Sequence, residues 1–414
     1  MSDAANSIRK PARRPVRVIP IVEVVLLVLL ITVPFFVSDF LTIIVTRMII
    51  LGMLAISFDL CWGYSGIMTF GQALFFGMSG YVVALLANKA GFVQLWGVIP
   101  LGMLVGLVVS FLIAWFLLLG KHRPEIIFVA LGTLTASYAA ERLVAGWEWV
   151  GAGNGMSIFD FLLIGDYELE PGIVFYYIAA AILVIVYLAS RYLVRSQFGL
   201  VLAGMRQNED RLAFFGYRIQ VFKALVFCFA GMIAGLSGAL YTYHEGFVGP
   251  GSMGMALSTY AVLYGLFGGT GTLLGPLIGV VAIESISFVL SDLDEVKSFW
   301  PIILGVIMLI VVAYKPTGLM GFFVSQRERI GTFGVAENKR GKASRQVKGG
   351  DDGTAWHGAH HRSGVLEECS GADDRLHLVV RGVRSCGRPA LHSCGHGCLD
   401  VVCPGGRHSL DGHH

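Results

Sequence analysis

The stretch GYSGIMTFGQALFFGMSGY, residues 63–81, decides the fold, because it places five glycines and several polar side chains inside an otherwise apolar region. Lipid cannot satisfy the free N–H and C=O groups of a broken helix, so such a segment must be shielded by protein or line a water-filled cavity. The stretch therefore predicts a bundle of helices around a break. The residues that we assign to a solute path at this break are Tyr64, Ser65, Thr69 and Gln72. Close helix packing through small residues is the alternative interpretation of any one of these positions.

The composition extends this interpretation to the whole chain. Of its 414 residues, only 14% are charged and 55% are hydrophobic. Apolar runs of about 18 or more residues recur, which predicts an all-α, polytopic integral membrane protein. The ten expected transmembrane helices lie at about 18–37, 41–62, 67–87, 97–119, 125–144, 172–190, 221–241, 255–269, 274–290 and 299–314.

The charges between these spans predict the topology. Residues 1–17 are basic, and so are the segments near 121–123, 191–223 and 315–329, whereas residues 145–171 hold five acidic residues and no Lys or Arg. Basic loops stay in the cytoplasm, so we expect both termini to be cytoplasmic. The net charge of +3 is small and its basic residues cluster in these loops, which argues against nucleic acid as a partner.

The C-terminal segment, residues 341–414, differs in composition. It holds nine of the eleven histidines and five of the seven cysteines, with Trp356 as its one aromatic residue, so we predict a disordered tail. An altered reading frame is one hypothesis for its composition. Zinc binding through residues such as Cys394, His396 and Cys398 is an alternative, but the usual Cys-x2-Cys spacing is missing and we predict no metal site.

The motifs of enzymes are missing from the sequence. It contains no Gly-x4-Gly-Lys-Ser/Thr phosphate loop, no His-Glu-x2-His helix and no Gly-x-Ser-x-Gly elbow. We therefore predict a protein that is not an enzyme and binds no nucleotide itself, so that any ATP energy comes from a partner.

Glycines four residues apart predict close helix packing in two further regions. The residues assigned to this packing are Gly231, Gly235, Gly265, Gly269, Gly271 and Gly275. The segment GGTGTLLGP, residues 268–276, predicts a tight turn between spans.

Ionisable residues at membrane depth are few. Each costs roughly 2.5 to 3.5 kcal/mol at a helix centre, so each is expected to face protein or water. These residues are Glu23, Arg47, Asp59, Glu141, Arg142 and Glu284.

Five segments together resemble one transporter family. FDLCWGYSGIMTFGQALFFGMSGY, GAGNGM, the passage from residue 196 to 241, FGGTGTLLGPLIG and KPTGLMG follow one another in the order seen in LivM-type permeases of bacterial branched-chain amino acid ABC importers. The resemblance covers about residues 40–322, within a permease domain at 18–322.

This resemblance implies an all-helical subunit of the bacterial inner membrane. It implies four partners: a LivH-like second permease, two cytosolic ATPases that use ATP and Mg, and a periplasmic solute-binding protein. Branched-chain or other hydrophobic amino acids are the expected solutes. Gln72 stands where many relatives have His, and some motifs resemble the urea permeases, so urea or a short amide is the alternative. An ion-coupled secondary carrier is a second alternative.

The polar segment at 196–220 resembles the cytoplasmic coupling loop of such importers. In the family an acidic residue, small residues and a glycine form a short helix that docks on an ATPase. The residues that we assign to this role are Asp210, Leu212, Ala213, Phe214, Phe215 and Gly216. We also expect Arg206 and Asp210 to pair at i, i+4 on one helix. An amphipathic loop on anionic membrane lipid is the alternative.

Overall fold

The computed structural model describes residues 18–120, 126–291, 302, 305, 306, 309 and 318–320. The chain divides into two units, Met1–Gly350 and Asp351–His414, and the described residues all belong to the first. The basic segment 1–17 and the tail 341–414 therefore lie outside the described residues. Almost all of the tenth span, predicted at 299–314, lies outside them as well.

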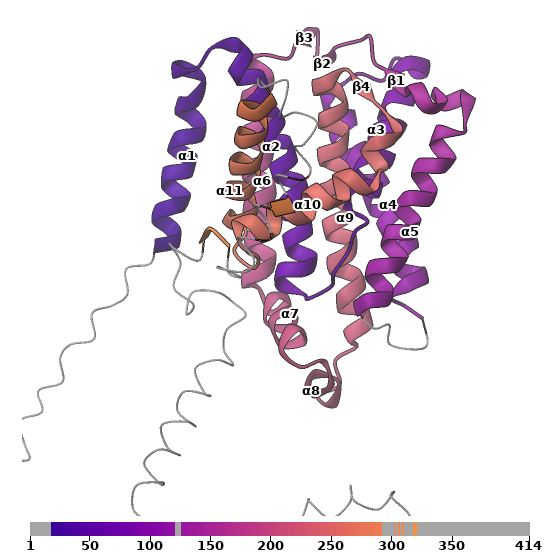
Figure 1. Cartoon of the computed structure of the whole chain (residues 1–414), viewed down its shortest axis with the longest axis vertical. Helices are drawn as coiled ribbons and strands as arrows, with labels where there is room; N and C mark the ends of the chain where they lie inside the picture. Colours follow the sequence, from indigo (N-terminus) through magenta and orange to yellow (C-terminus); the bar gives the residue numbers. More distant parts are fainter. Residues whose placement is uncertain are drawn as a thin grey trace, which may run out of the picture. The chain divides into compact units, whose positions relative to one another are not determined.

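Long apolar helices form a bundle (Figure 1). They are α1 (Val18–Phe36), α2 (Asp39–Asp59), α3 (Gln72–Ala90), α4 (Leu95–Leu117), α5 (Ile126–Ala145), α6 (Ile173–Arg195), α9 (Ile219–Glu245) and α11 (Leu274–Ser291). Within the described ranges, six helices are long and apolar enough to cross a membrane, beginning with the α2 segment Asp39–Tyr64. The chain is thus a helical membrane protein with several spans.

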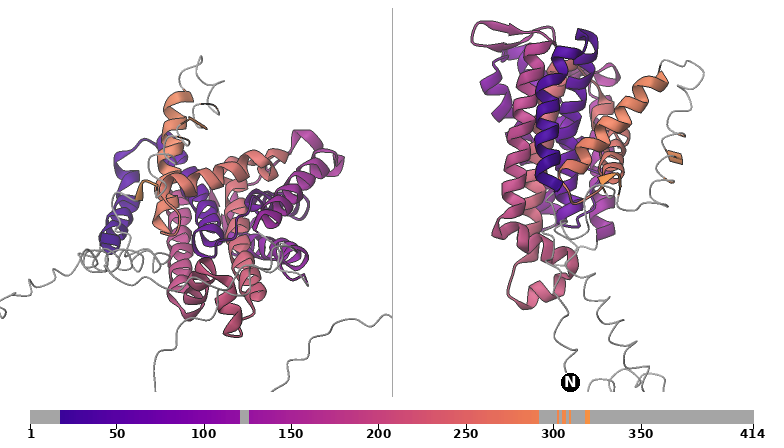
Figure 2. Two further views of the ribbon diagram at one scale, coloured as in Figure 1. Left: turned by 60° about the horizontal axis from the view of Figure 1, so that its bottom comes forward. Right: turned by 90° about the vertical axis from the view of Figure 1, so that its left-hand side faces the viewer.

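The helix predicted at 255–269 is present as α10 (Met255–Gly268), but it is short. Fourteen residues rise about 21 Å, less than the hydrocarbon core of about 30 Å. Figures 1 and 2 show α10 running obliquely across the long helices, and α11 turning back from its end. Gly269 and Gly271, in the turn between them, have φ values of 109° and 81°, which favour glycine.

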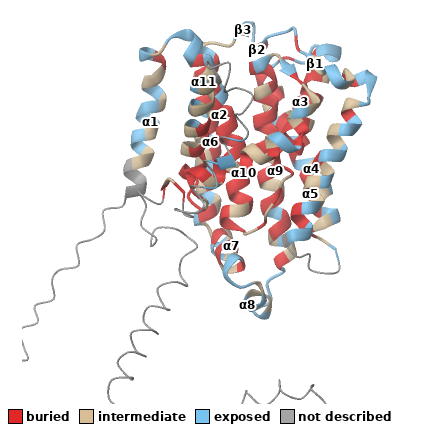
Figure 3. Ribbon diagram, in the orientation of Figure 1, coloured by how far each residue is buried: buried red, intermediate tan, exposed pale blue. Residues whose placement is uncertain are grey.

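Helix α9 lies at the centre of the bundle, where buried residues dominate (Figure 3). It packs against α4 through glycines and one serine. A Cβ on Gly235 would lie 2.5 Å from the Gly102 carbonyl oxygen, and one on Gly231 would lie 2.3 Å from the Ser110 Cβ. The two helix backbones can approach this closely only because the α9 glycines face small residues of α4.

The other predicted packing glycines lie around α10 and its turn. A Cβ on Gly265 would lie 2.7 Å from a ring carbon of Phe58 in α2. A Cβ on Gly275 would lie 2.2 Å from the Gly269 carbonyl oxygen. These contacts hold α10 against α2 and close the turn on itself.

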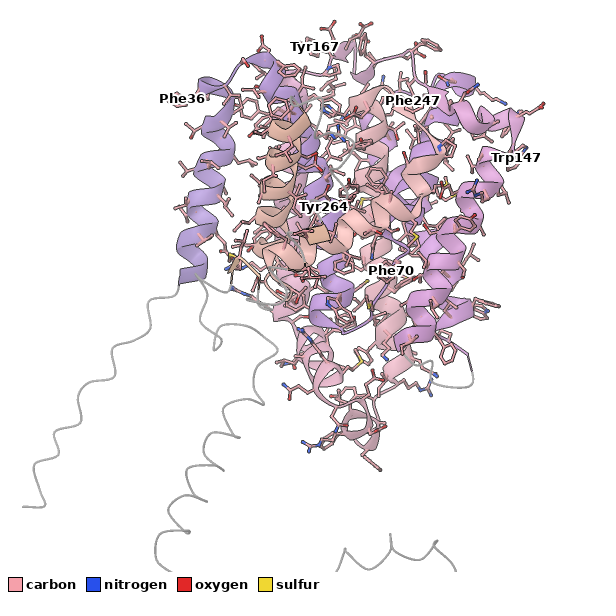
Figure 4. The ribbon with its side chains drawn as sticks, in the orientation of Figure 1. Phe36, Phe70, Trp147, Tyr167, Phe247 and Tyr264 are labelled. Atoms are coloured by element: carbon pink, nitrogen blue, oxygen red, sulfur yellow. The ribbon has the colours of Figure 1, made fainter. Side chains whose placement is uncertain are left out.

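One end of the bundle carries short irregular elements. Single turns occur at Glu148–Val150 (η2), Ala152–Asn154 (η3) and Pro250–Met253 (η4), and the strands are β1 (Met156–Ser157), β2 (Leu162–Ile164), β3 (Tyr167–Leu169) and β4 (Phe247–Val248). β1 pairs antiparallel with β4, and β2 with β3. Figure 4 shows Phe36, Trp147, Tyr167 and Phe247 at this end, as expected for aromatic residues at a membrane interface.

Helices α7 (Gln197–Gln207) and α8 (Glu209–Phe214) extend from the opposite end of the bundle (Figure 1). The acidic loop at 145–171 and the basic segment at 191–223 therefore lie at opposite ends of the bundle. The all-α prediction holds for the bundle, and the short strand pairs are the addition to it.

Candidate functional site

The break predicted from residues 63–81 separates α2 from α3. A π-helical turn, η1 (Leu60–Tyr64), ends α2, and residues 65–71 are irregular before α3 begins. The irregular backbone finds partners inside the protein: Ile67 N–H donates to the Cys61 carbonyl at 2.9 Å, and Phe70 N–H donates to Thr133 Oγ1 at 3.1 Å. Figure 4 shows Phe70 between the two ends of the bundle. The break is thus shielded by protein, as lipid requires.

The four residues assigned to a solute path are all buried, with at most 8% of their surface exposed. Their polar groups bond within the chain. Ser65 Oγ donates to the Cys61 carbonyl at 2.6 Å, and Thr69 Oγ1 accepts from Gly71 N–H at 3.1 Å. Their role in a path stays a prediction.

The remaining two of these residues connect the break to its neighbours. Gln72 accepts a hydrogen bond from Ser57 Oγ at 3.0 Å, and the Tyr64 hydroxyl accepts one from Leu273 N–H at 3.3 Å. Tyr64 thereby links η1 to the turn that follows α10.

Asp59 binds the same turn. Its carboxylate, fully buried, accepts a hydrogen bond from Gly271 N–H at 2.7 Å. A Cβ on Gly63 would lie 2.0 Å from the Asp59 carboxylate and 2.5 Å from Gly271 N, so glycine is required at position 63. The expectation that Asp59 faces protein is met, with the glycine turn as its partner.

Arg206, at the end of α7, reaches the break directly. Its guanidinium donates a hydrogen bond to the Gly63 carbonyl. A Cβ on Gly271 would lie 3.3 Å from the same guanidinium, and one on Gly66 would lie 3.5 Å from the Arg206 Cγ. Arg206 therefore touches both the η1 break and the turn between α10 and α11.

The prediction that Arg206 and Asp210 lie on one helix is wrong. Helix α7 ends at Gln207, Asn208 is extended with φ −165° and ψ 104°, and α8 begins at Glu209. The two residues therefore belong to different helices. Asn208 favours this break because its side chain caps α8, accepting from Arg211 N–H at 3.1 Å.

Helix α8 ends at the predicted glycine. Gly216 has a φ of 84°, its N–H donates to the Ala213 carbonyl at 2.9 Å, and Tyr217 N–H donates to the Leu212 carbonyl at 3.3 Å. A left-handed glycine after the last turn is a common helix ending. Lys223 of α9 pairs with Glu209 at 2.7 Å and holds the start of α8.

The residues assigned to coupling divide into two groups. Phe214 is 91% exposed and Phe215 is 79% exposed, so both rings face outward from α8, and Asp210 is exposed as well. Leu212 and Ala213 are partly buried and pack inward. A surface for a partner therefore consists of the two aromatic rings rather than of the whole segment.

Sequence reasoning missed several residues of this arrangement. Thr133 of α5 accepts a hydrogen bond from the backbone of the break, and Gly102 and Gly106 of α4 pack against α9. The stretch LGMLVGLVVS, residues 101–110, carried a signal for the latter pair, since Gly102, Gly106 and Ser110 follow one another at i, i+4. Thr133 carried no comparable signal.

In the described part of the chain, no group of three His, Cys, Asp or Glu residues could hold a metal ion. Cys61 is a buried free thiol, and Cys228 is a half-buried one. The tail cysteines and histidines considered for zinc lie outside the described residues.

Known proteins resemble this chain over most of its length. The LivM permease of the high-affinity branched-chain amino acid transport system is 24% identical in Salmonella typhimurium, over 71% of this chain and 73% of the relative. The Escherichia coli LivM permease is also 24% identical, over 72% and 74%. A probable LivM permease of Methanocaldococcus jannaschii is 25% identical, over 65% and 89%.

No solved structure matches the chain. The family described as branched-chain amino acid transport system / permease component matches residues 40–312, which is more than half of the sequence. This match confirms the resemblance noted from the motifs. The protein therefore belongs to the family of permease components of branched-chain amino acid transport systems.

Proposed function

We propose that this protein is the permease subunit of an ATP-driven importer that moves branched-chain or other hydrophobic amino acids across the bacterial inner membrane. The observation that carries the proposal is the family match over residues 40–312, in a chain with several membrane-spanning helices. The names of the three relatives support the choice of solute. The chain is a transport subunit, and hydrolysis of ATP belongs to separate subunits.

The complete importer would contain four partners. They are a LivH-like second permease, two cytosolic ATPases that use ATP and Mg²⁺, and a periplasmic solute-binding protein. The exposed rings of Phe214 and Phe215 support a docking role for α8, because apolar side chains of this size gain free energy when a partner covers them. Arg206 would then pass movement of α7 and α8 to the break at Gly63.

The proposed topology places both ends of the chain in the cytoplasm and keeps the ten predicted apolar segments, of which α10 is too short to cross the bilayer by itself. Its support is the distribution of charge, since the basic α7–α8 end lies opposite the acidic loop. Labelling Asp166→Cys and Arg211→Cys, each in a background without the seven native cysteines, with an impermeant thiol reagent in intact cells tests it. Position 166 should react from outside and position 211 only after the cells are opened. The reverse pattern would overturn the orientation.

Reconstitution of the complete importer tests the function. With ATP inside the vesicles and the binding protein outside, leucine should accumulate, and the permease alone should not accumulate it. Preference for urea over leucine would favour the urea alternative, which the resemblance of some motifs to urea permeases raises. Accumulation by the permease alone under an ion gradient would favour the secondary carrier.

A further inference from the structure

A polar pocket lies apart from the break, between α2, α9, α10 and α11. Arg47 of α2, Tyr241 of α9, Tyr260 and Tyr264 of α10, and Glu284 of α11 line it. Its volume is about 250 Å³. Pockets for drug-sized ligands occupy about 300 to 1,000 Å³, so this one suits a smaller solute.

The pocket lies at membrane depth, toward the end that carries the short strands. Arg47 follows the start of α2 by eight residues, or about 12 Å, and Glu284 precedes the end of α11 by seven residues, or about 10 Å. Figure 4 shows Tyr264 between the two ends of the bundle, on the face where α10 crosses it. By the proposed topology, this half of the bundle faces the outside.

The positive charge in the pocket is accessible. The Arg47 side chain is 46% exposed, and its nearest acidic partner, Glu245, lies 3.9 Å away and is itself 34% exposed. A charge-assisted hydrogen bond is about 2.7 to 2.9 Å long, so Glu245 leaves donors of the guanidinium open to another acceptor. The guanidinium also lies 6.0 Å from the centroid of the Tyr241 ring. Charged groups at this depth do not face lipid, so the pocket opens to water or to protein.

The negative charge of Glu284 lines the same pocket and is held in place. Glu284 accepts a hydrogen bond from the Tyr264 hydroxyl, and the Tyr264 ring stacks on Tyr260 with centroids 6.1 Å apart. These contacts hold the carboxylate on the pocket wall. The remainder of the lining includes aliphatic side chains, Leu51 and Leu257.

We propose that this pocket binds the transported amino acid as a zwitterion during its passage. Arg47 binds the carboxylate of the solute, and Glu284 binds its ammonium group. Leu51 and Leu257 contact its aliphatic side chain. The choice of an amino acid rests on the proposed function. A neutral solute such as urea needs neither a cationic nor an anionic partner, so a pocket lined by both Arg47 and Glu284 favours an amino acid.

Uptake by the reconstituted importer with saturating leucine-loaded binding protein isolates the permease step. Glu284→Gln and Arg47→Gln should each lower leucine uptake at least tenfold, while the ATPase activity stimulated by the loaded binding protein persists. Matched controls lose the same charges elsewhere: Glu168→Gln in the exposed β3 strand and Arg142→Gln in α5 should transport as the wild type does. Wild-type uptake in either pocket variant would overturn the proposal.

A second measurement covers variants that fail to assemble. Ala256 lines the pocket and is exposed, so Ala256→Cys is a small change. In a background without the seven native cysteines, its reaction with a charged thiol reagent should slow at least threefold when the importer turns over leucine. An equal rate with and without leucine would overturn the pocket assignment. Failure of the wild-type importer to move any branched-chain amino acid would instead overturn the proposed function.

Discussion

Arg206, near the end of α7, donates a hydrogen bond to the backbone carbonyl of Gly63 in η1, 143 residues earlier in the chain. The bond joins the segment that projects from the bundle to the break between α2 and α3. The neighbouring turn at Gly271 touches both, through the Arg206 guanidinium and the Asp59 carboxylate. Arg206 therefore connects α7 to two irregular segments at once.

Arg206→Ala should uncouple transport without releasing the ATPases. The substitution removes a hydrogen bond from a charged donor, which contributes roughly 1.5 to 3 kcal/mol, so uptake per complex should fall about tenfold or more. The exposed rings of α8 stay in place, so co-purification of the ATPases should be normal. Leucine uptake and ATPase recovery, measured on the same preparation, check both parts.

Gln207→Ala is the matched control for this experiment. Gln207 is exposed at the same end of α7, and its replacement should leave uptake unchanged. Arg206→Lys should retain part of the activity, because lysine keeps the charge but loses the planar guanidinium. Loss of the ATPases from the Arg206→Ala complex would show that the residue acts in docking instead.

Replacing Phe214 and Phe215 together by alanine should release the ATPases, which Arg206→Ala should not do. Both rings are exposed in the single chain, so the fold should be unaffected. Burial of each ring by a partner contributes roughly 1.5 to 3 kcal/mol, so recovery of the ATPases should fall at least tenfold. Co-purification from detergent extracts measures the loss.

Leu212→Ala provides the comparison within α8. Leu212 packs inward, close to Gly204 of α7, so its truncation should lower the thermal stability of the permease before it affects docking. Full ATPase recovery and normal uptake in the double phenylalanine variant would remove the support for a coupling role of α8.

The sequence was sufficient for features that local chemistry determines. Apolar runs located most of the helices, and the Asn208, Glu209 and Asp210 sequence contained a signal for a new helix start, a capping residue followed by acidic residues. We instead expected one helix through Arg206 and Asp210, because charge spacing was considered without the cap. We also expected a transmembrane helix at 255–269, although about 15 apolar residues do not span a bilayer.

Other features depend on contacts between distant residues and have no local pattern. Nothing near Arg206 indicates that its partner is the Gly63 carbonyl, and nothing near Glu284 indicates that it shares a pocket with Arg47. The cost of insertion predicted only that Arg47 and Glu284 face protein or water, and the tertiary fold places them in one pocket. The glycines of 63–81 likewise predicted a break, but not the π-helical turn that begins it.

Thr69→Val should destabilise the break. Thr69 is fully buried, and its hydroxyl accepts the hydrogen bond of Gly71 N–H just before α3. Valine has a similar volume but leaves that buried N–H without its partner, which costs about 1 to 3 kcal/mol. The melting temperature of the purified permease and the uptake per assembled complex should both fall, and Thr69→Ser should restore both. A lower uptake with unchanged stability would show that Thr69 contacts the solute rather than the backbone.

Gly235→Ala should force α4 and α9 apart. The added Cβ would lie 2.5 Å from the Gly102 carbonyl oxygen and 2.7 Å from the Gly106 Cα, and both are backbone atoms that no side-chain rotation can move away. Overpacking of this kind costs about 1 to 3 kcal/mol, so the melting temperature of the purified permease should fall.

Gly106→Ala should have the same effect from the other helix, because its Cβ would lie 2.3 Å from the Gly231 carbonyl oxygen. Gly153→Ala is the control, since a Cβ there meets no atom within 4 Å and stability should be unchanged. Wild-type melting of Gly235→Ala would contradict the close packing of α4 on α9, since a methyl group can be accommodated there only if the two backbones lie farther apart.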